Sequence, residues 1–172
     1  MDTNKIILGI VKKEKDIVYG ARSIQRQTGI VSRPTSDWDI FSNKPKSSAE
    51  KTEHALDKSA GKNLYYTKPA IHAGTYKVEF VGKDMKKGTK DDVGIADFTT
   101  MPKPKPATIN LGGILYRKLS GEKKAKMKAL KDPTQEFRHA KDQEDFNRIE
   151  LGEAMELNPK SIIGKFNRGV KF

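Results

Sequence analysis

The sequence predicts an α+β (α/β) fold in which a small mixed β-sheet is flanked by helices and followed by a helical C-terminal part. Its 172 residues have the size of a single domain and are enough to bury a core. Several short apolar runs, such as IVY, TYKVEF and VGIADF, have the length and the flanking turn residues of strands. Segments with helical spacing of apolar residues lie before, between and after these runs, which indicates a domain that contains both element types.

The composition narrows the class of partner. The formal net charge is +12 and the pI is near 9.7, so polyanions such as nucleic acid, nucleotides or an anionic membrane are attracted to the surface. The absence of cysteine excludes a disulfide scaffold, a thiolate metal site and a cysteine nucleophile. The apolar run IILGIV is too short to span a bilayer, and basic residues rather than a cleavage site follow it. We therefore expect a cytoplasmic protein that does not insert into a membrane.

Local patterns place the elements of the first third of the chain. Apolar residues at helical spacing predict an N-terminal helix that Asp2 or Thr3 caps, and glycines mark the ends of the elements that follow. The expected elements are a helix over 2–15, a buried strand over 16–19, a short helix over 23–27, a half-buried strand over 37–41 and a solvated helix from about 47 to Gly61.

The remaining chain is expected to add strands first and helices afterwards. Three prolines in MPKPKP cannot donate hydrogen bonds to a sheet, so this segment is a stiff basic edge or linker within one domain. The expected elements are strands within 64–80 and 93–99 joined by a lysine-rich hairpin-like loop, a Gly112–Gly113 turn between a short strand and a helix, a basic helix over 120–131, and a long helix capped by Thr134 and ending near Leu157. We divide the single domain, 1–172, into an α/β core (1–106), a helical part (107–157) and a basic tail (158–172).

An acidic doublet carries the clearest chemical signal. Side chains at positions i and i+2 of a strand point to the same face, so Asp37 and Asp39 can share a cation while Trp38 and Ile40 bury the opposite face. Mg²⁺ prefers oxygen ligands and is commonly held by one or two carboxylates together with substrate phosphates. The doublet therefore predicts a metal site, although two solvated acids on an edge strand would give the same pattern.

A glycine turn precedes the doublet. A turn that leads from a strand into a short helix offers backbone N–H groups and the positive end of the helix to phosphates. Gly20, Arg22 and Ser23 lie where such a phosphate site is expected, whereas the simpler interpretation is a glycine that only joins a strand to a helix.

Together these motifs resemble those of the polymerase-beta-like nucleotidyltransferases, and most of all the AbiEii-type toxin branch. The resemblance rests on Gly20–Ile24, Gly29 and the run Arg33–Phe41. It implies a nucleotidyltransferase-like fold, binding of an NTP such as ATP, and Mg²⁺ or Mn²⁺ as the metal. It also implies a third metal ligand on a neighbouring strand, for which Asp97 fits best and Glu79 is the substitute. The chain departs from the family pattern at the second turn position, which is an alanine without the hydroxyl that commonly contacts phosphate.

A weaker similarity lies in the C-terminal half. The run from Arg138 to Phe146 is similar to a Lys-Asp-x-x-Asp helix of the same branch, which follows a lysine-bearing helix; the earlier lysine corresponds to Lys124, Lys126 or Lys128. A solvated helix face with i,i+4 ion pairs would look the same. The resemblance implies catalytic roles for Asp37, Asp39, Asp97, Asp142 and Asp145, metal binding by Asp37, Asp39 and Asp97, and nucleotide binding by Gly20, Arg22, Ser23, Arg33, Ser36 and Lys141.

These observations predict a metal-dependent enzyme that transfers a nucleotidyl group from an NTP to an acceptor hydroxyl. The positive charge makes RNA, such as a tRNA end, the first acceptor to consider, with a protein or small molecule as other options. The alternative is a non-catalytic basic protein, associated with nucleic acid or structural in role, from a virus or mobile element. A third hypothesis is a toxin whose protein partner is an antitoxin.

Overall fold

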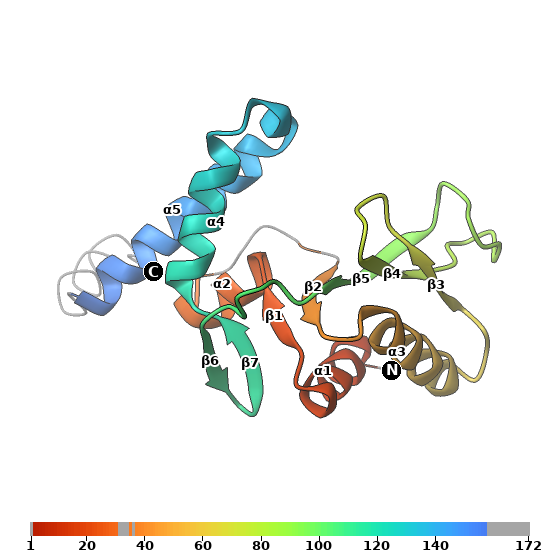
Figure 1. Ribbon diagram of the computed structural model, residues 1–172. Helices are drawn as coiled ribbons and strands as arrows, with labels where there is room; N and C mark the ends of the chain where they lie inside the picture. The colour runs from red at the N-terminus through yellow and green to blue at the C-terminus, as the bar shows by residue number, and fades with distance from the viewer. Residues whose placement is uncertain (1, 31–34, 36, 158–172) are drawn as a thin grey trace, which may run out of the picture.

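A seven-stranded mixed sheet forms the centre of the computed structural model, which describes residues 2–30, 35 and 37–157 (Figure 1). The strand order is β3-β4-β5-β2-β1-β7-β6. The strands are β1 (Ile17–Tyr19), β2 (Trp38–Ser42), β3 (Tyr65–Pro69), β4 (Thr75–Phe80), β5 (Val93–Thr100), β6 (Thr108–Leu111) and β7 (Ile114–Arg117). The central β1 pairs antiparallel with β2 and parallel with β7, and β2 pairs parallel with β5. The expected mixed α/β sheet is confirmed.

The helices fall into two groups. The first group is α1 (Thr3–Glu14) and α3 (Pro45–Ala60), which pack on each other and on one face of the sheet. The second group consists of α4 (Leu119–Leu130), the short 3₁₀ helix η1 (Pro133–Arg138) and α5 (His139–Leu157), with α2 (Ala21–Thr28) packed at its base. In Figure 1 α4 and α5 lie side by side as an arm that rises from the β1 region of the sheet. No helix within the described residues is long and apolar enough to cross a membrane.

The main core lies between the sheet and α1 with α3. Trp38 and Ile40 of β2 point into it, as the alternation in this strand predicts, and they belong to the same buried cluster as Ile7 and Val11 of α1. Each fully buried aliphatic side chain of this kind contributes about 1.5–3 kcal/mol. Because Trp38 and Ile40 occupy the core face, Asp39 between them is directed to the opposite face.

Helix ends follow the expected capping residues in most places. Asp2 caps α1 by accepting a hydrogen bond from the backbone N–H of Lys5 at 3.1 Å. Gly29 and Gly61 end α2 and α3 in the left-handed conformation, with φ of 68° and 65°. At the start of the last helical segment Asp132, not Thr134, is the cap, and a 3₁₀ helix precedes α5. The expected single helix from Thr134 is therefore wrong in its first turns.

The turn at Gly112–Gly113 corrects a second expectation. It connects two antiparallel strands, β6 and β7, rather than a strand and a helix. Both glycines have positive φ, 67° and 84°, which is what a tight two-residue hairpin turn requires. The apolar run around this turn is thus a hairpin, and β7 extends the sheet by pairing with β1.

Candidate active site

Four side chains from four neighbouring strands form a row across one face of the sheet. Tyr19 of β1 lies opposite Asp39 of β2, and Asp39 lies opposite Asp97 of β5. Asp97 in turn lies opposite Lys77 of β4. Residues paired in register point to the same face of a sheet, and all four line one cavity. We call these four residues the cross-strand row; it brings together two of the acids predicted to bind metal.

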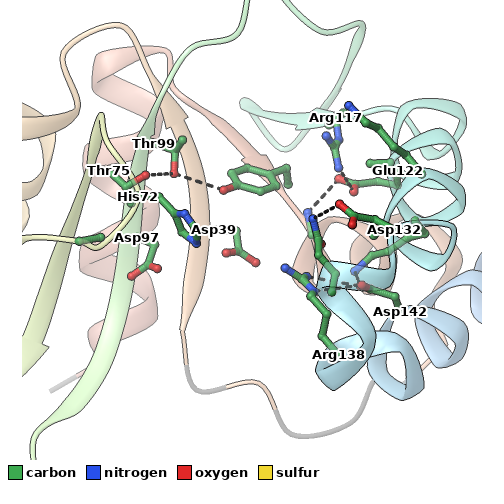
Figure 2. Close-up of a pocket in the computed structure, with 18 of the residues that line it drawn as sticks. Asp39, His72, Thr75, Asp97, Thr99, Arg117, Glu122, Asp132, Arg138 and Asp142 are labelled. Carbon is green, nitrogen blue, oxygen red and sulfur yellow. Dashed lines mark hydrogen bonds and ion pairs between the residues drawn. The ribbon is translucent and has the colours of Figure 1, made fainter.

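A cavity of about 650 Å³ lies between the cross-strand row and the arm (Figure 2). Figure 2 shows Asp39 and Asp97 on the sheet side, opposite Arg117, Glu122 and Asp142. The strands β4 and β5 add Thr75 and Thr99 to the wall. The loop after β3 and the arm add further lining residues; they are Ala70, Ile71, His72, Ala125, Lys128, Ala129, Asp132 and Gln135. The wall formed by the sheet is therefore rich in acids and hydroxyls. The wall formed by the helices carries both positive and negative side chains.

The electrostatics of the site centre on Asp39. Burial, together with the negative charges of Asp37, Asp97 and Glu122, raises the pKa of Asp39 from 3.8 to about 7. Burial also raises the pKa of Asp97, although the ammonium group of Lys77 lies 3.0 Å from its carboxylate and opposes the shift. A group of acids whose mutual repulsion is only partly offset by lysine would gain from a further cation.

Asp37 and Glu79 are placed differently from this pair. Asp37 directly precedes β2 and is half-buried, and its charge acts on both Asp39 and Asp97. Glu79, the substitute for the third acid, accepts a hydrogen bond from Tyr66 at 2.6 Å. Within the described parts of the chain, no three Asp, Glu or His side chains are arranged as ligands of one metal ion.

The turn at Gly20 lies directly against Asp39. Gly20 has φ 72° and ψ −153°, a region that is essentially restricted to glycine, and a Cβ at this position would collide with Oδ2 of Asp39. Its backbone N–H donates to Oε1 of Glu122 at 2.9 Å. The glycine therefore allows the backbone to approach the acid closely, and its N–H is held by α4.

Arg22 and Ser23, predicted to contact phosphate, have partners within the protein. The guanidinium of Arg22 donates to the carbonyls of Thr35 at 2.9 Å and Asp37 at 2.8 Å, and it stacks over the Trp38 ring at 4.2 Å. Ser23 is fully buried and donates to the carbonyl of Arg117 at 3.0 Å. Both residues hold the elements that surround the cavity. Arg33 and Ser36, also predicted to bind nucleotide, lie outside the described residues.

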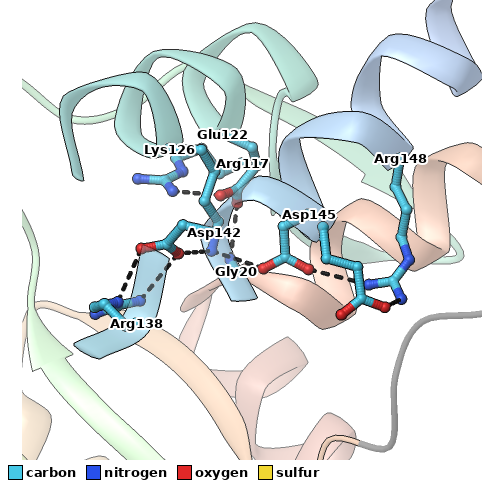
Figure 3. Close-up of polar contacts among 9 residues, drawn as sticks. Gly20, Arg117, Glu122, Lys126, Arg138, Asp142, Asp145 and Arg148 are labelled. Carbon is cyan, nitrogen blue, oxygen red and sulfur yellow. Dashed lines mark hydrogen bonds and ion pairs between the residues drawn. The ribbon is translucent and has the colours of Figure 1, made fainter. Parts of the chain in front are cut away.

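The arm contains a buried ion cluster, which Figure 3 shows in detail. Lys126 of α4 pairs with Asp142 at 2.8 Å and with Asp145 at 2.7 Å. Both aspartates are 0% exposed, and each has a second partner, Arg138 for Asp142 and Arg148 for Asp145. Although burial acts to raise the pKa of Asp142, the hydrogen bond and charge of Lys126 and the charge of Arg138 lower it.

The predicted residues of the arm differ in their access to the cavity. Lys126 and Asp142 line it, whereas Asp145 does not. Lys141 is exposed and is not part of the cavity wall. Of the three lysines considered as counterparts of the earlier family lysine, Lys126 is the one that pairs with both aspartates.

Sequence reasoning missed Lys77, Arg117 and Glu122. The signal for Lys77 was its alternation with Val78 in a strand, since this places it on the polar face. Glu122 lies in the lysine-rich run SGEKKAKMKALK, which indicates a solvated helix, but its side chain is fully buried. Nothing local in the sequence marks Glu122 or Arg117 as neighbours of the glycine turn.

No protein-family model matches the sequence, and no curated protein matches it. Solved structures do resemble it. The Megavirus polyadenylate synthase superposes over 89% of this chain and 31% of its own, with a TM-score of 0.70 and 17% identity. JHP933 from Helicobacter pylori superposes over 84% of this chain and 61% of its own, with a TM-score of 0.54 and 17% identity. ANT(2'')-Ia in complex with adenylyl-2''-tobramycin superposes over 93% of this chain and 96% of its own, with a TM-score of 0.51 and 12% identity.

The chain has a nucleotidyltransferase fold. At these identities the similarity concerns the arrangement of the backbone, and the chain spans about a third of the length of the Megavirus enzyme. The fold expected from the polymerase-beta-like resemblance is thereby confirmed. The closer resemblance to the AbiEii-type branch stays a prediction.

Proposed function

We propose that this chain transfers a nucleotidyl group from an NTP to the hydroxyl of an acceptor. The observation that carries the proposal is the register pairing of Asp39 with Asp97 at the floor of a cavity, beside the Gly20 turn, in a nucleotidyltransferase fold. In the reaction the acceptor oxygen bonds to the α-phosphorus. The bond from the α-phosphorus to the β-bridging oxygen breaks, and pyrophosphate leaves with the electron pair.

The residues present fit a hard divalent cation. Asp37, Asp39 and Asp97 offer only oxygen ligands, which suit Mg²⁺ or Mn²⁺. The pKa of Asp39 is raised by its burial and by the negative charges of Asp37, Asp97 and Glu122, which a bound cation would offset. We propose these three acids as the metal-binding residues. When bound, such an ion would supply Lewis-acid polarisation of a phosphoryl oxygen.

The other residues of the site have proposed roles that follow from their positions. Gly20 keeps the space over Asp39 open, and Lys77 holds the carboxylate of Asp97 in place. Asp142 lines the cavity and is proposed to accept the proton of the acceptor hydroxyl, supported by Asp145 behind it. Positioning and electrostatics of this kind account for most of the catalysis of phosphoryl transfer.

RNA is the first acceptor to test. The net charge of +12 favours a polyanion, and a structural neighbour is named for polyadenylate synthesis. The experiment incubates the protein with Mg²⁺ or Mn²⁺, each labelled NTP and total RNA, and compares Asp37→Ala and Asp39→Ala with the unmodified chain. Transfer that both variants lose supports the proposal. Salt-sensitive nucleic-acid binding without any transfer would instead establish the non-catalytic basic protein.

The AbiEii-type resemblance adds one specific alternative in the same enzyme class. A toxin of this branch would arrest growth when expressed, and an antitoxin would be its protein partner. Arrest that Asp39→Ala abolishes would support this, whereas normal growth on expression of an active enzyme would exclude it.

A further inference from the structure

We propose that Arg117 binds the triphosphate of the nucleotide at the Gly20 end of the cavity and that Glu122 is the positioning residue that orients it. This rests on the proposed function, because it assigns a residue to the nucleotide of that reaction. Neither residue belongs to the motifs that suggested the activity.

Arg117 has hydrogen-bonding capacity that the protein does not use. It ends β7 and lines the cavity, and its side chain is 15% exposed. A guanidinium carries five N–H donors. One nitrogen, Nη2, donates to Oε2 of Glu122. Nε is buried and is the one buried side-chain nitrogen, among the residues that the structure describes, without a hydrogen-bond partner. Because the side chain is partly exposed on the cavity wall, a phosphate oxygen there can accept from the guanidinium N–H groups that Glu122 does not engage.

The guanidinium is also held in place by aromatic rings. It lies 5.3 Å from the centre of the Tyr19 ring and 5.6 Å from that of Phe41, and these two rings stack on each other at 3.8 Å. Such stacking fixes the plane of an arginine fork, which matches the geometry of phosphate oxygens better than a lysine does. Tyr19 belongs to the cross-strand row, so the arginine is anchored directly beside Asp39.

Most other cations of the cavity pair with carboxylates, and Lys128 lies at its exposed rim. Lys77 pairs with Asp97, and Lys126 is shared between Asp142 and Asp145. Glu122, in contrast, divides its two oxygens between the backbone N–H of Gly20 and the Arg117 guanidinium. A fully buried carboxylate that bridges these two groups fixes Arg117 relative to the glycine turn. This is why we assign Glu122 a positioning role.

Calorimetry tests the proposal by measuring the binding of three ligands: inorganic tripolyphosphate, ATP, and a short oligoribonucleotide with a 5′ hydroxyl. Arg117→Met should weaken tripolyphosphate and ATP binding by about 10-fold to 100-fold, the usual loss for one hydrogen-bonded charge. Arg117→Lys keeps the positive charge but not the forked guanidinium, so its affinity for tripolyphosphate and ATP should lie between those of the unmodified chain and of Arg117→Met. Arg26→Met is the matched control, because it removes the same charge from an exposed position on α2 outside this cavity; its binding should stay within about 2-fold.

Glu122→Gln keeps an acceptor for Gly20 but weakens the hold on Arg117. In the transfer assay it should raise the KM for the NTP more than it lowers kcat, whereas a purely structural role would leave KM unchanged in the folded fraction. Circular dichroism reports whether each variant is folded. If Arg117→Met does not fold, the tripolyphosphate affinity of Arg117→Lys tests the assignment instead.

The outcomes separate this inference from the proposed function. Unchanged tripolyphosphate binding by a folded Arg117 variant, no tripolyphosphate binding by the unmodified chain, or a loss confined to the oligoribonucleotide overturns the Arg117 assignment. If Arg117-dependent tripolyphosphate binding is present but no nucleotide is ever transferred, the assignment stands and the proposed function fails. If transfer occurs equally in Arg117→Met, the function stands and the assignment fails.

Discussion

Asp39 and Asp97 are register partners on two parallel strands, and both carboxylates leave the sheet on the face that α1 and α3 do not cover. Their neighbours in the same row are Tyr19 and Lys77. The core face of the same strands is continuous and apolar, so the acids are displayed on a rigid support. This arrangement makes the site sensitive to single substitutions whose effects on folding and on activity can be separated.

Replacing Asp39 by Asn should nearly abolish nucleotidyl transfer. A metal-binding carboxylate supports several kcal/mol of charge stabilisation, so a loss of at least about 100-fold in kcat is expected. The measurement is the initial rate with saturating NTP and Mg²⁺. Asp2→Asn is the control, because asparagine also caps helices well and Asp2 lies outside the cavity. Equal rates for Asp39→Asn and the unmodified chain would exclude Asp39 from catalysis.

The same substitution should stabilise the protein at neutral to alkaline pH. Because the pKa of Asp39 is raised to about 7, the folded state binds this proton more tightly than the unfolded state. The free energy of unfolding should therefore fall as pH rises from about 4 to about 7, and Asp39→Asn should not show this component. Melting temperatures with a chelator at about pH 5 and about pH 8 test it, since each 1 kcal/mol shifts Tm by about 2–4 °C. A variant that is less stable than the unmodified chain at the higher pH contradicts the prediction.

Gly20→Ala should be more damaging than Gly29→Ala. Both glycines have φ near 70°, but a Cβ at Gly20 meets the Asp39 carboxylate, while a Cβ at Gly29 meets nothing within 4 Å. A strained backbone position alone costs about 1–3 kcal/mol. We therefore expect a loss of stability in both variants, measured by urea denaturation, and a loss of transfer beyond the unfolded fraction only in Gly20→Ala. Matching activity losses in the two variants would argue against the close packing of Gly20 on Asp39.

Lys126→Met should destabilise the arm strongly. It leaves Asp142 and Asp145 buried without their shared lysine, and removing one partner of a buried ion pair costs about 3–5 kcal/mol. Lys123→Met is the matched control on the same helix, because its partners Glu150 and Glu153 are at the surface and such pairs contribute about 0–1 kcal/mol. Urea denaturation compares the two. Similar midpoints would show that the Lys126 cluster is not a buried ion pair in solution.

The sequence predicted the parts of the site that depend on local geometry. Alternation in WDI was enough to direct Trp38 and Ile40 inward and Asp39 outward, and the glycines that end α2 and α3 were recognisable from their positions. These features depend on neighbouring residues, whose influence on the backbone is short-ranged.

The remaining parts depend on which elements pack together. Glu122 lies among lysines and is buried only because α4 packs against the Gly20 turn. The sequence around Gly112–Gly113 predicts a strand-to-helix connection, whereas the structure has a hairpin there. A short apolar run is compatible with either until its pairing with β1 is known. Arg117 shows the same limitation, because its environment is made by residues from β1, β2 and α4.

The hydrogen bond between Gly20 and Glu122 joins residues separated by 102 positions. A nascent chain that has emerged from the ribosome as far as the end of β5 therefore exposes Asp39, Asp97 and the glycine turn but not β7 or the arm. Contacts of such long sequence separation form late and slow the folding of a domain. We expect the nascent chain to bind no nucleotide until α4 and α5 have emerged from the ribosome and packed against the Gly20 turn.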